Sequence, residues 1–270
     1  MPYPTNCLID MRHGGGNSAS MNVLAIDTSA HLCAAAVLDT VAGKVVGQSV
    51  HDIGRGHSEK LMDVIGEALA AARLDYSSIG RIACSTGPGS FTGVRVGLAT
   101  ARGIALGLNV PVVGIGALEA SCAQARHILS VSSGATDKPD ILALIDAKRG
   151  EVFAQFFEAK QSGPGKAALD TGLDTGLEAG IAAGEPLVAP AAEIAAAFRG
   201  RPIVLCGSGA TAVREAGDAN WRIIHQLAAA DIEFYARLAK DRHDARIRPE
   251  PLYLRPADAK PQHGFAIPRV

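Results

Sequence analysis

Residues 87–97, GPGSFTGVRVG, form the stretch of this chain whose composition points most directly to chemistry. An apolar run precedes it and a long run of small residues follows, a pattern that predicts a strand, a tight turn and a helix. Glycine permits the sharp reversal, and Ser90 or Thr92 can cap the first N–H groups of the helix. Such a corner presents backbone donors and the positive end of a helix dipole to an anion. A structural corner without a ligand fits the same pattern.

Two familiar kinds of site are not indicated by the sequence. The glycine-rich stretch has no following Gly-Lys-Ser or Gly-Lys-Thr, which a P-loop requires, and its spacing does not match a dinucleotide fingerprint. The five cysteines form no C-x-x-C pair, and the histidines form no H-E-x-x-H motif. We therefore predict neither a metal site nor a catalytic residue in this chain.

The composition limits the classes of protein to which the chain can belong. Its 270 residues are 48% hydrophobic, which is enough for one large domain or two smaller ones. The net charge of −1 gives no overall basic field, so contact with nucleic acid would be local or shared with a partner. Scattered cysteines without a disulfide pattern suit a reducing compartment, and no apolar run is long enough to span a membrane. We expect a cytoplasmic protein without a membrane segment.

The elements that must position these residues follow from the hydrophobic periodicity. In the first half, strands are expected at 22–26, 32–38, 44–50, 81–85 and 110–115, and helices at 57–73, 92–108 and 117–129. In the second half, strands are expected at 141–146, 151–158 and 203–206, and helices at 191–198 and 232–240, before an extended tail at 249–255. Each half thus begins with hairpin strands and continues with alternating helices and strands. This order predicts an α/β protein in which one RNase H-like subdomain (21–130) precedes another (131–255).

Three further segments lack periodic apolar residues. Residues 1–20 are expected to be a disordered leader or to precede the natural start at Met21, where a clean strand begins. Residues 159–185 are rich in Gly and Ala and are expected to be a flexible insertion. Residues 256–270 are expected to be a tail.

Five strings of the chain resemble one known family, TsaB, also called YeaZ. They are LAIDTS (24–29), HSEKLM (57–62), GPGSFTGVRVG (87–97), DAKRGEVF (146–153) and YLR (253–255). Their order and spacing match from Met21 to about Arg255, while the leader and the Gly/Ala insertion depart from the family. The resemblance implies the actin/hexokinase/chaperone-ATPase fold, built from two tandem RNase H-like subdomains.

The resemblance also implies a function. Members of this family are subunits needed to form threonylcarbamoyladenosine next to the anticodon in tRNA. They are implied to dimerise with TsaD, the paralogue that transfers the threonylcarbamoyl group, and TsaE, an ATPase, joins that pair. The chain would be a non-catalytic, activating subunit, and a homodimer stays open. The alternative is an ATP-binding enzyme of the same fold or a metallopeptidase-like hydrolase, in line with the older label of glycoprotease.

The absence of metal ligands is also implied by the resemblance. The catalytic paralogue carries a His-x-x-x-His pair on a helix, and two imidazoles at this spacing can bind one metal ion. Here the corresponding positions are Ala117 and Ser121. No cofactor is therefore expected in this chain, although residual ATP or ADP at the interface of the complex stays open.

Two turns are candidates for binding nucleotide or phosphate. In this fold the first hairpin turn can cradle phosphate, and here it contains Asp27, Thr28 and Ser29. Its usual glycine is missing, so a plain turn closed by an Asx hydrogen bond is the alternative. The second half places Asp146, Lys148 and Arg149 at its own hairpin turn, where basic groups can meet phosphate or an acidic partner or simply be solvated.

The partner interface is expected on the two helices at 57–73 and 92–108. Small residues along 92–108 let another helix approach closely, which core packing also explains, and the apolar stripe at 57–73 can cover the sheet, so that only additional apolar surface would need a partner. The resemblance implies that these two helices pair with the matching helices of another copy or of TsaD. The candidate interface residues are His57, Glu59, Leu61, Met62, Ile65, Phe91, Thr92, Gly93, Arg95, Gly97 and Thr100.

Overall fold

The computed structural model describes residues 21–133, 139–159, 185–240, 242 and 248–255. The expectations for the leader, for residues 160–184 of the insertion and for the tail at 256–270 lie outside the described residues.

The first half is built on a five-stranded mixed sheet in the order β3-β2-β1-β4-β5. Strands β1, β2 and β3 form an antiparallel meander, and β4 and β5 run parallel to β1. The bounds of these strands are β1 (Asn22–Asp27), β2 (Leu32–Asp39), β3 (Lys44–Asp52), β4 (Ile79–Gly87) and β5 (Val112–Gly116). β1 and β2 are buried along nearly their whole length, which explains their unbroken apolar runs. The predicted three-stranded start is confirmed.

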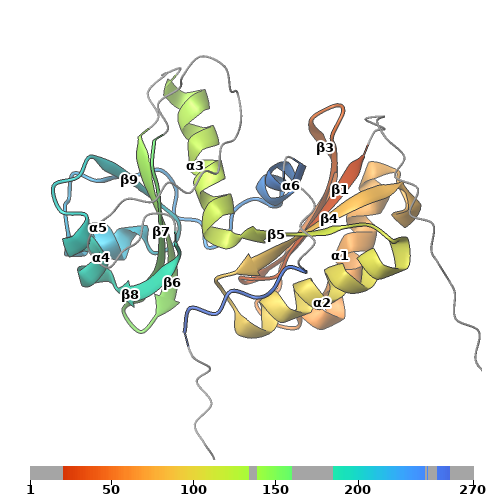
Figure 1. Cartoon of the computed structure of the whole chain (residues 1–270), viewed down its shortest axis with the longest axis horizontal. Coiled ribbons are helices and arrows are strands. Elements are labelled where there is room, and N and C mark those ends of the chain that lie inside the picture. Colours follow the sequence, from red (N-terminus) through yellow and green to blue (C-terminus); the bar gives the residue numbers. More distant parts are fainter. Residues whose placement is uncertain (1–20, 134–138, 160–184, 241, 243–247, 256–270) are drawn as a thin grey trace, which may run out of the picture.

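Two helices cover one face of this sheet, as Figure 1 shows. They are α1 (His57–Ala72) and α2 (Phe91–Leu108), and a short 3₁₀ turn, η1 (Tyr76–Ser78), leads into β4. Leu61 and Ile65 of α1 and Leu98 of α2 pack with β1 and β2 in one hydrophobic cluster. The N-cap residue of α1 is Gly56, so no side chain caps this helix.

The second half repeats the same topology. Its sheet has the order β10-β9-β6-β7-β8, so the first strand is again central, with an antiparallel hairpin on one side and parallel strands on the other. The helices α4 (Ala191–Ala197) and α5 (Ala210–Ala216) pack on one face. The strands are β6 (Asp140–Lys148), β7 (Glu151–Phe157), β8 (Leu187–Pro190), β9 (Ile203–Cys206) and β10 (Arg222–Ile223). The sequence analysis missed β8, α5 and β10, all of which are short.

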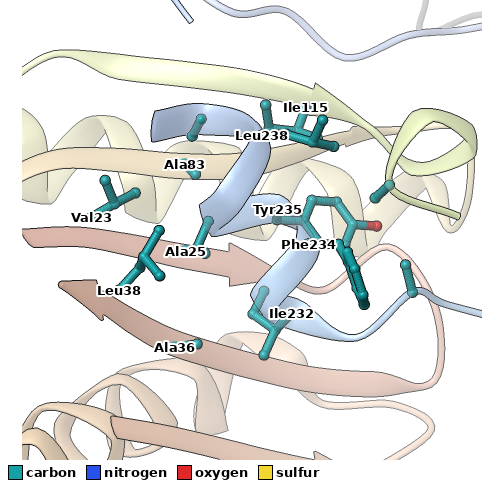
Figure 2. Packing of buried hydrophobic residues seen from close by; sticks show 14 of the residues in the cluster. Val23, Ala25, Ala36, Leu38, Ala83, Ile115, Ile232, Phe234, Tyr235 and Leu238 are labelled. Carbon is teal, nitrogen blue, oxygen red and sulfur yellow. The ribbon is translucent and has the colours of Figure 1, made fainter. Parts of the chain in front are cut away.

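The two halves exchange a helix. α3 (Ala117–Ser133) follows the first sheet, yet Leu118 and Cys122 pack against β6 of the second sheet. α6 (Ile232–Lys240) follows the second sheet, yet it packs on the first sheet. Figure 2 shows Tyr235 and Leu238 of α6 facing β1, β2, β4 and β5.

The predicted boundary at residue 130 lies within α3, so the helix exchange crosses it. The boundary separates the two sheets in sequence, but α6 belongs by packing to the first sheet and α3 contacts both. An amphipathic helix must bury its apolar face, and its sequence does not say which sheet provides the cover. None of the helices in the described ranges is long and apolar enough to cross a membrane.

Candidate functional site

The corner between β4 and α2 has the predicted geometry. β4 ends at Gly87, whose φ of 87° lies in the left-handed region, and α2 begins at Phe91. The Ser90 hydroxyl accepts a hydrogen bond from the Gly93 N–H at 3.2 Å and so caps the helix. Of the two predicted caps, Ser90 is therefore the one used.

The turn between β1 and β2 closes over this corner. The Ser90 N–H donates to the Ser29 carbonyl oxygen at 2.7 Å, and the Thr28 hydroxyl donates to the Gly93 carbonyl oxygen at 2.7 Å. Asp27, Thr28 and Ser29 are 3%, 1% and 4% exposed. The three residues predicted as a nucleotide site, Asp27, Thr28 and Ser29, are therefore buried against the start of α2 in this conformation. The Asx hydrogen bond, from Ser29 N–H to the Asp27 carboxylate at 2.8 Å, is present.

Glycines make this close approach possible. A Cβ at Gly93 would overlap the Thr28 carbonyl oxygen, a Cβ at Gly89 would overlap the Ser29 carbonyl oxygen, and a Cβ at Gly97 would lie within 2.5 Å of the Thr28 hydroxyl. The prediction that Gly93 and Gly97 face a partner helix is therefore corrected. They face the β1–β2 turn of their own chain.

Asp27 is a buried carboxyl group at the centre of this half. Loss of solvent raises its pKa, while Ser29, Ser85 and Tyr235 around it oppose that rise. The same burial, together with the Asp27 carboxyl, raises the pKa of the Cys33 thiol to about 11. Tyr235 of α6 lies beside Asp27, and its buried hydroxyl has no hydrogen-bond partner among the described residues.

We expect Asp27→Asn to raise the melting temperature by a few degrees at pH 8. The folded pKa of Asp27 lies above its unfolded value, so the stability contributed by this group is present at low pH and is lost as the pH rises through the folded pKa. Asparagine does not ionise and keeps an acceptor for the Ser29 N–H. The measurement is thermal unfolding from pH 4 to pH 8, in which the gain should shrink toward pH 4. Asp63→Asn, at an exposed position of α1, should show no such trend.

The corresponding turn of the second half is open. Asp146 and Lys148 at the end of β6 and Arg149 in the turn are exposed, and Lys148 and Arg149 have positive φ angles. The Lys148 ammonium lies 2.7 Å from the Asp146 carboxylate, and this partner lowers the pKa of Asp146. The Asp146 N–H donates to the Ser208 hydroxyl at 3.0 Å. This turn keeps its basic side chains on the surface, and it remains our candidate for phosphate.

The positions aligned with the paralogue's histidine pair lie inside the protein. Ala117 and Ser121 are 4% and 3% exposed, and the Ser121 hydroxyl contacts the Cys206 sulfur at 3.6 Å. Among the described residues, no group of three or more His, Cys, Asp or Glu side chains is placed to hold a metal ion.

The structure divides the predicted interface residues into two sets. Leu61 and Ile65 are 1% and 0% exposed and His57 is 8% exposed, so these three belong to the core, and their assignment to an interface was wrong. The exposed members of the set are Glu59, Met62, Phe91, Thr92 and Arg95, and Thr100 is half-buried. The stripe of apolar residues on α1 was correctly recognised, but its cover is the first sheet.

One surface group was missed by the sequence analysis. The Arg95 guanidinium lies 3.7 Å from the centre of the Phe91 ring, and its Nε donates to the Tyr253 hydroxyl at 2.7 Å. The rings of Phe91 and Tyr253 have centroids 5.1 Å apart. The YLR string at 253–255 was a signal that this segment matters, but nothing in the sequence pairs it with residues about 160 positions earlier.

A family model described as TsaD, tRNA N6-adenosine threonylcarbamoyltransferase, matches residues 51–243. The chain belongs to this family. Within it, similar proteins carry the name TsaB. The Escherichia coli tRNA threonylcarbamoyladenosine biosynthesis protein TsaB is 32% identical over 143 residues, which are 53% of this chain and 58% of that protein.

A second TsaB relative and a solved structure agree with this placement. TsaB from Haemophilus influenzae is 34% identical over 134 residues, 50% of this chain and 52% of that protein. The chain thus spans about half the length of the curated relatives it matches. The structure of YeaZ from Pseudomonas aeruginosa has a TM-score of 0.61 and 24% identity, and the match covers 81% of this chain and 90% of that one. The expected α/β fold is confirmed, since the YeaZ structure shares it, and the similarity to proteins named TsaB and YeaZ agrees with the resemblance found in the sequence.

Proposed function

We propose that this chain is a non-catalytic subunit in the formation of threonylcarbamoyladenosine in tRNA, and that it acts by pairing with a TsaD-type transferase. The family membership supports the pathway, since the relatives are named for this biosynthesis. The surface of α1 and α2 supports the pairing. Large apolar side chains stay exposed there, with Met62 at 50%, Phe91 at 45% and Leu106 at 81%.

The closed β1–β2 turn is the observation that favours a subunit over an ATP-binding enzyme. A kinase-type reaction needs that turn open to phosphate, and here Ser29 and Thr28 bond to the start of α2 instead. The open turn of the second half, with Lys148 and Arg149, is where a nucleotide or acidic group of the complex would be met. A TsaE-type ATPase and the tRNA would join through the complex, and a second copy of this chain is the rival partner.

The test of this function is complementation. Cells depleted of their own TsaB, when given this chain, are expected to regain the modified nucleoside in tRNA, measured by mass spectrometry of nucleosides. The purified chain alone is expected to transfer nothing to tRNA. Transfer by the chain alone, or cells that stay unmodified despite soluble expression, would contradict the proposal.

The pairing surface gives a sharper prediction. Met62→Glu is expected to weaken binding to a TsaD-type transferase by about tenfold or more, because a carboxylate would have to lose its water in an apolar contact. The fold should stay intact, since half of the Met62 side chain is already in solvent. Isothermal titration calorimetry measures the affinity.

The matched control for this experiment is Val131→Glu on α3, an exposed apolar residue at 73% that lies outside α1 and α2. It should bind the transferase as the unsubstituted chain does. If Met62→Glu binds equally well, the interface does not include this part of α1. If it disrupts a homodimer and leaves the transferase contact unchanged, the face serves a second copy.

A further inference from the structure

The C-terminal strap, residues 249–255, contacts both halves of the molecule. In Figure 1 this blue segment runs beside α2 and continues toward the second sheet. On the first half, the Leu252 N–H donates to the Thr86 carbonyl oxygen of β4 at 2.9 Å. The Arg102 guanidinium of α2 donates to the Pro249 carbonyl oxygen. These contacts join segments far apart in the sequence and fix the strap along the first half.

The far end of the strap holds the second half. Arg255 donates to the Ala147 carbonyl oxygen of β6 at 3.3 Å and forms an ion pair with Glu151 of β7. It therefore joins both strands that flank the open β6–β7 turn. Both partners are about one-quarter to one-third exposed, so solvent screens this ion pair only in part.

Tyr253 lies between these two anchors. Its hydroxyl accepts a hydrogen bond from the Arg95 guanidinium of α2, and its ring packs beside the Phe91 ring. Tyr253 thus holds the Arg95 and Phe91 side chains in one arrangement. Arg95 and Arg102 are seven residues apart and so share one side of the helix, the side that the strap follows. Close contact, a charge-assisted hydrogen bond and ring packing together make this arrangement specific.

We propose that Tyr253 is a positioning residue and that the strap couples the second half to α2. Because Arg255 is tied to the β6–β7 turn, a movement of that turn pulls on the segment that holds Arg95 and Phe91. An event at the open turn, such as the arrival of an acidic or phosphate group near Lys148, is thereby transmitted to the α2 surface. The effect on a partner rests on the proposed function, whereas the coupling itself does not.

The first experiment measures the coupling without a partner. Amide hydrogen exchange followed by mass spectrometry is run on the full chain and on Glu151→Gln, which removes the ion pair in the second half. We expect the Leu252 amide, bonded to β4 in the first half, to exchange about tenfold faster in the variant. Unchanged exchange at 249–255 would overturn the proposal.

The matched control is Arg201→Gln. It removes a comparably exposed ion pair of the second half, between Arg201 and Asp140 at 3.8 Å, that does not touch the strap. It is expected to leave Leu252 exchange as in the unsubstituted chain. An equal acceleration in the control would mean general loosening of the second half and would also overturn the proposal.

The second experiment is a double-mutant cycle on affinity for a TsaD-type transferase. Glu151→Gln alone is expected to weaken binding about three- to tenfold, and to have no further effect in a Tyr253→Ala background. Additive effects would show that the second half acts on binding by another route and would overturn the coupling to α2. If the unsubstituted chain binds no transferase, the proposed function fails, and the exchange experiment alone decides on the strap.

Discussion

Leu61→Glu is expected to leave the protein largely unfolded at 37 °C. The Leu61 side chain is 1% exposed and packs with Ile65 and with β1 and β2 under α1. A carboxylate at this position loses its water and finds no partner in the cluster, and the packing of leucine is lost as well. Together these effects cost about 3–5 kcal/mol, a large part of the stability of an ordinary domain.

Circular dichroism during thermal unfolding measures this loss. Met62→Glu is the matched control, because it places the same charge on the adjacent residue, whose side chain is half exposed. It should melt within a few degrees of the unsubstituted protein. A folded Leu61→Glu with an unchanged melting temperature would show that α1 does not pack on the sheet as described.

Gly93→Ala is expected to destabilise the protein by about 3 kcal/mol or more, although alanine is the better helix former. The added Cβ would overlap the Thr28 carbonyl oxygen, and that backbone is held in place by hydrogen bonds to Ser90 and Gly93. Either α2 moves away from the β1–β2 turn or the turn opens. In both cases the buried Asp27 meets solvent.

Gly103→Ala on the same helix separates packing from helix propensity. Nothing lies within 4 Å of a Cβ at Gly103, so this change is expected to stabilise the protein by about 0.5–1 kcal/mol. Chemical denaturation of both variants gives the two free energies of unfolding. Equal values would show that α2 is not in close contact with the turn.

The sequence predicted those features that are encoded locally. The β4–α2 corner, its Ser90 cap and the hairpin strands depend on glycine, capping residues and apolar runs within a few positions. The segment that buries the apolar face of a helix, by contrast, can lie far away in the sequence. Leu61 and Ile65 were assigned to a partner because the period of α1 shows that a face is buried without showing what buries it.

The same reason explains the other misses. The packing of α6 on the first sheet and the contact between Tyr253 and Arg95 join segments far apart in the chain. The open and closed states of the two hairpin turns also could not be distinguished, because the groups that close the first turn come from α2. The family resemblance supplied the fold, but the assignment of side chains to core or surface needed the three-dimensional arrangement.

The helix exchange makes neither half a self-sufficient folding unit. A polypeptide ending after α3 would lack α6 and leave the inner face of the first sheet bare, while the complementary polypeptide would lack the α3 residues that cover β6. Each fragment expressed alone is expected to aggregate. When the two fragments are produced together, they are expected to associate and to bury both exposed sheet faces again. Co-expression of two fragments divided between residues 133 and 139 would therefore yield folded protein only when both fragments are present, because each completes the fold of the other.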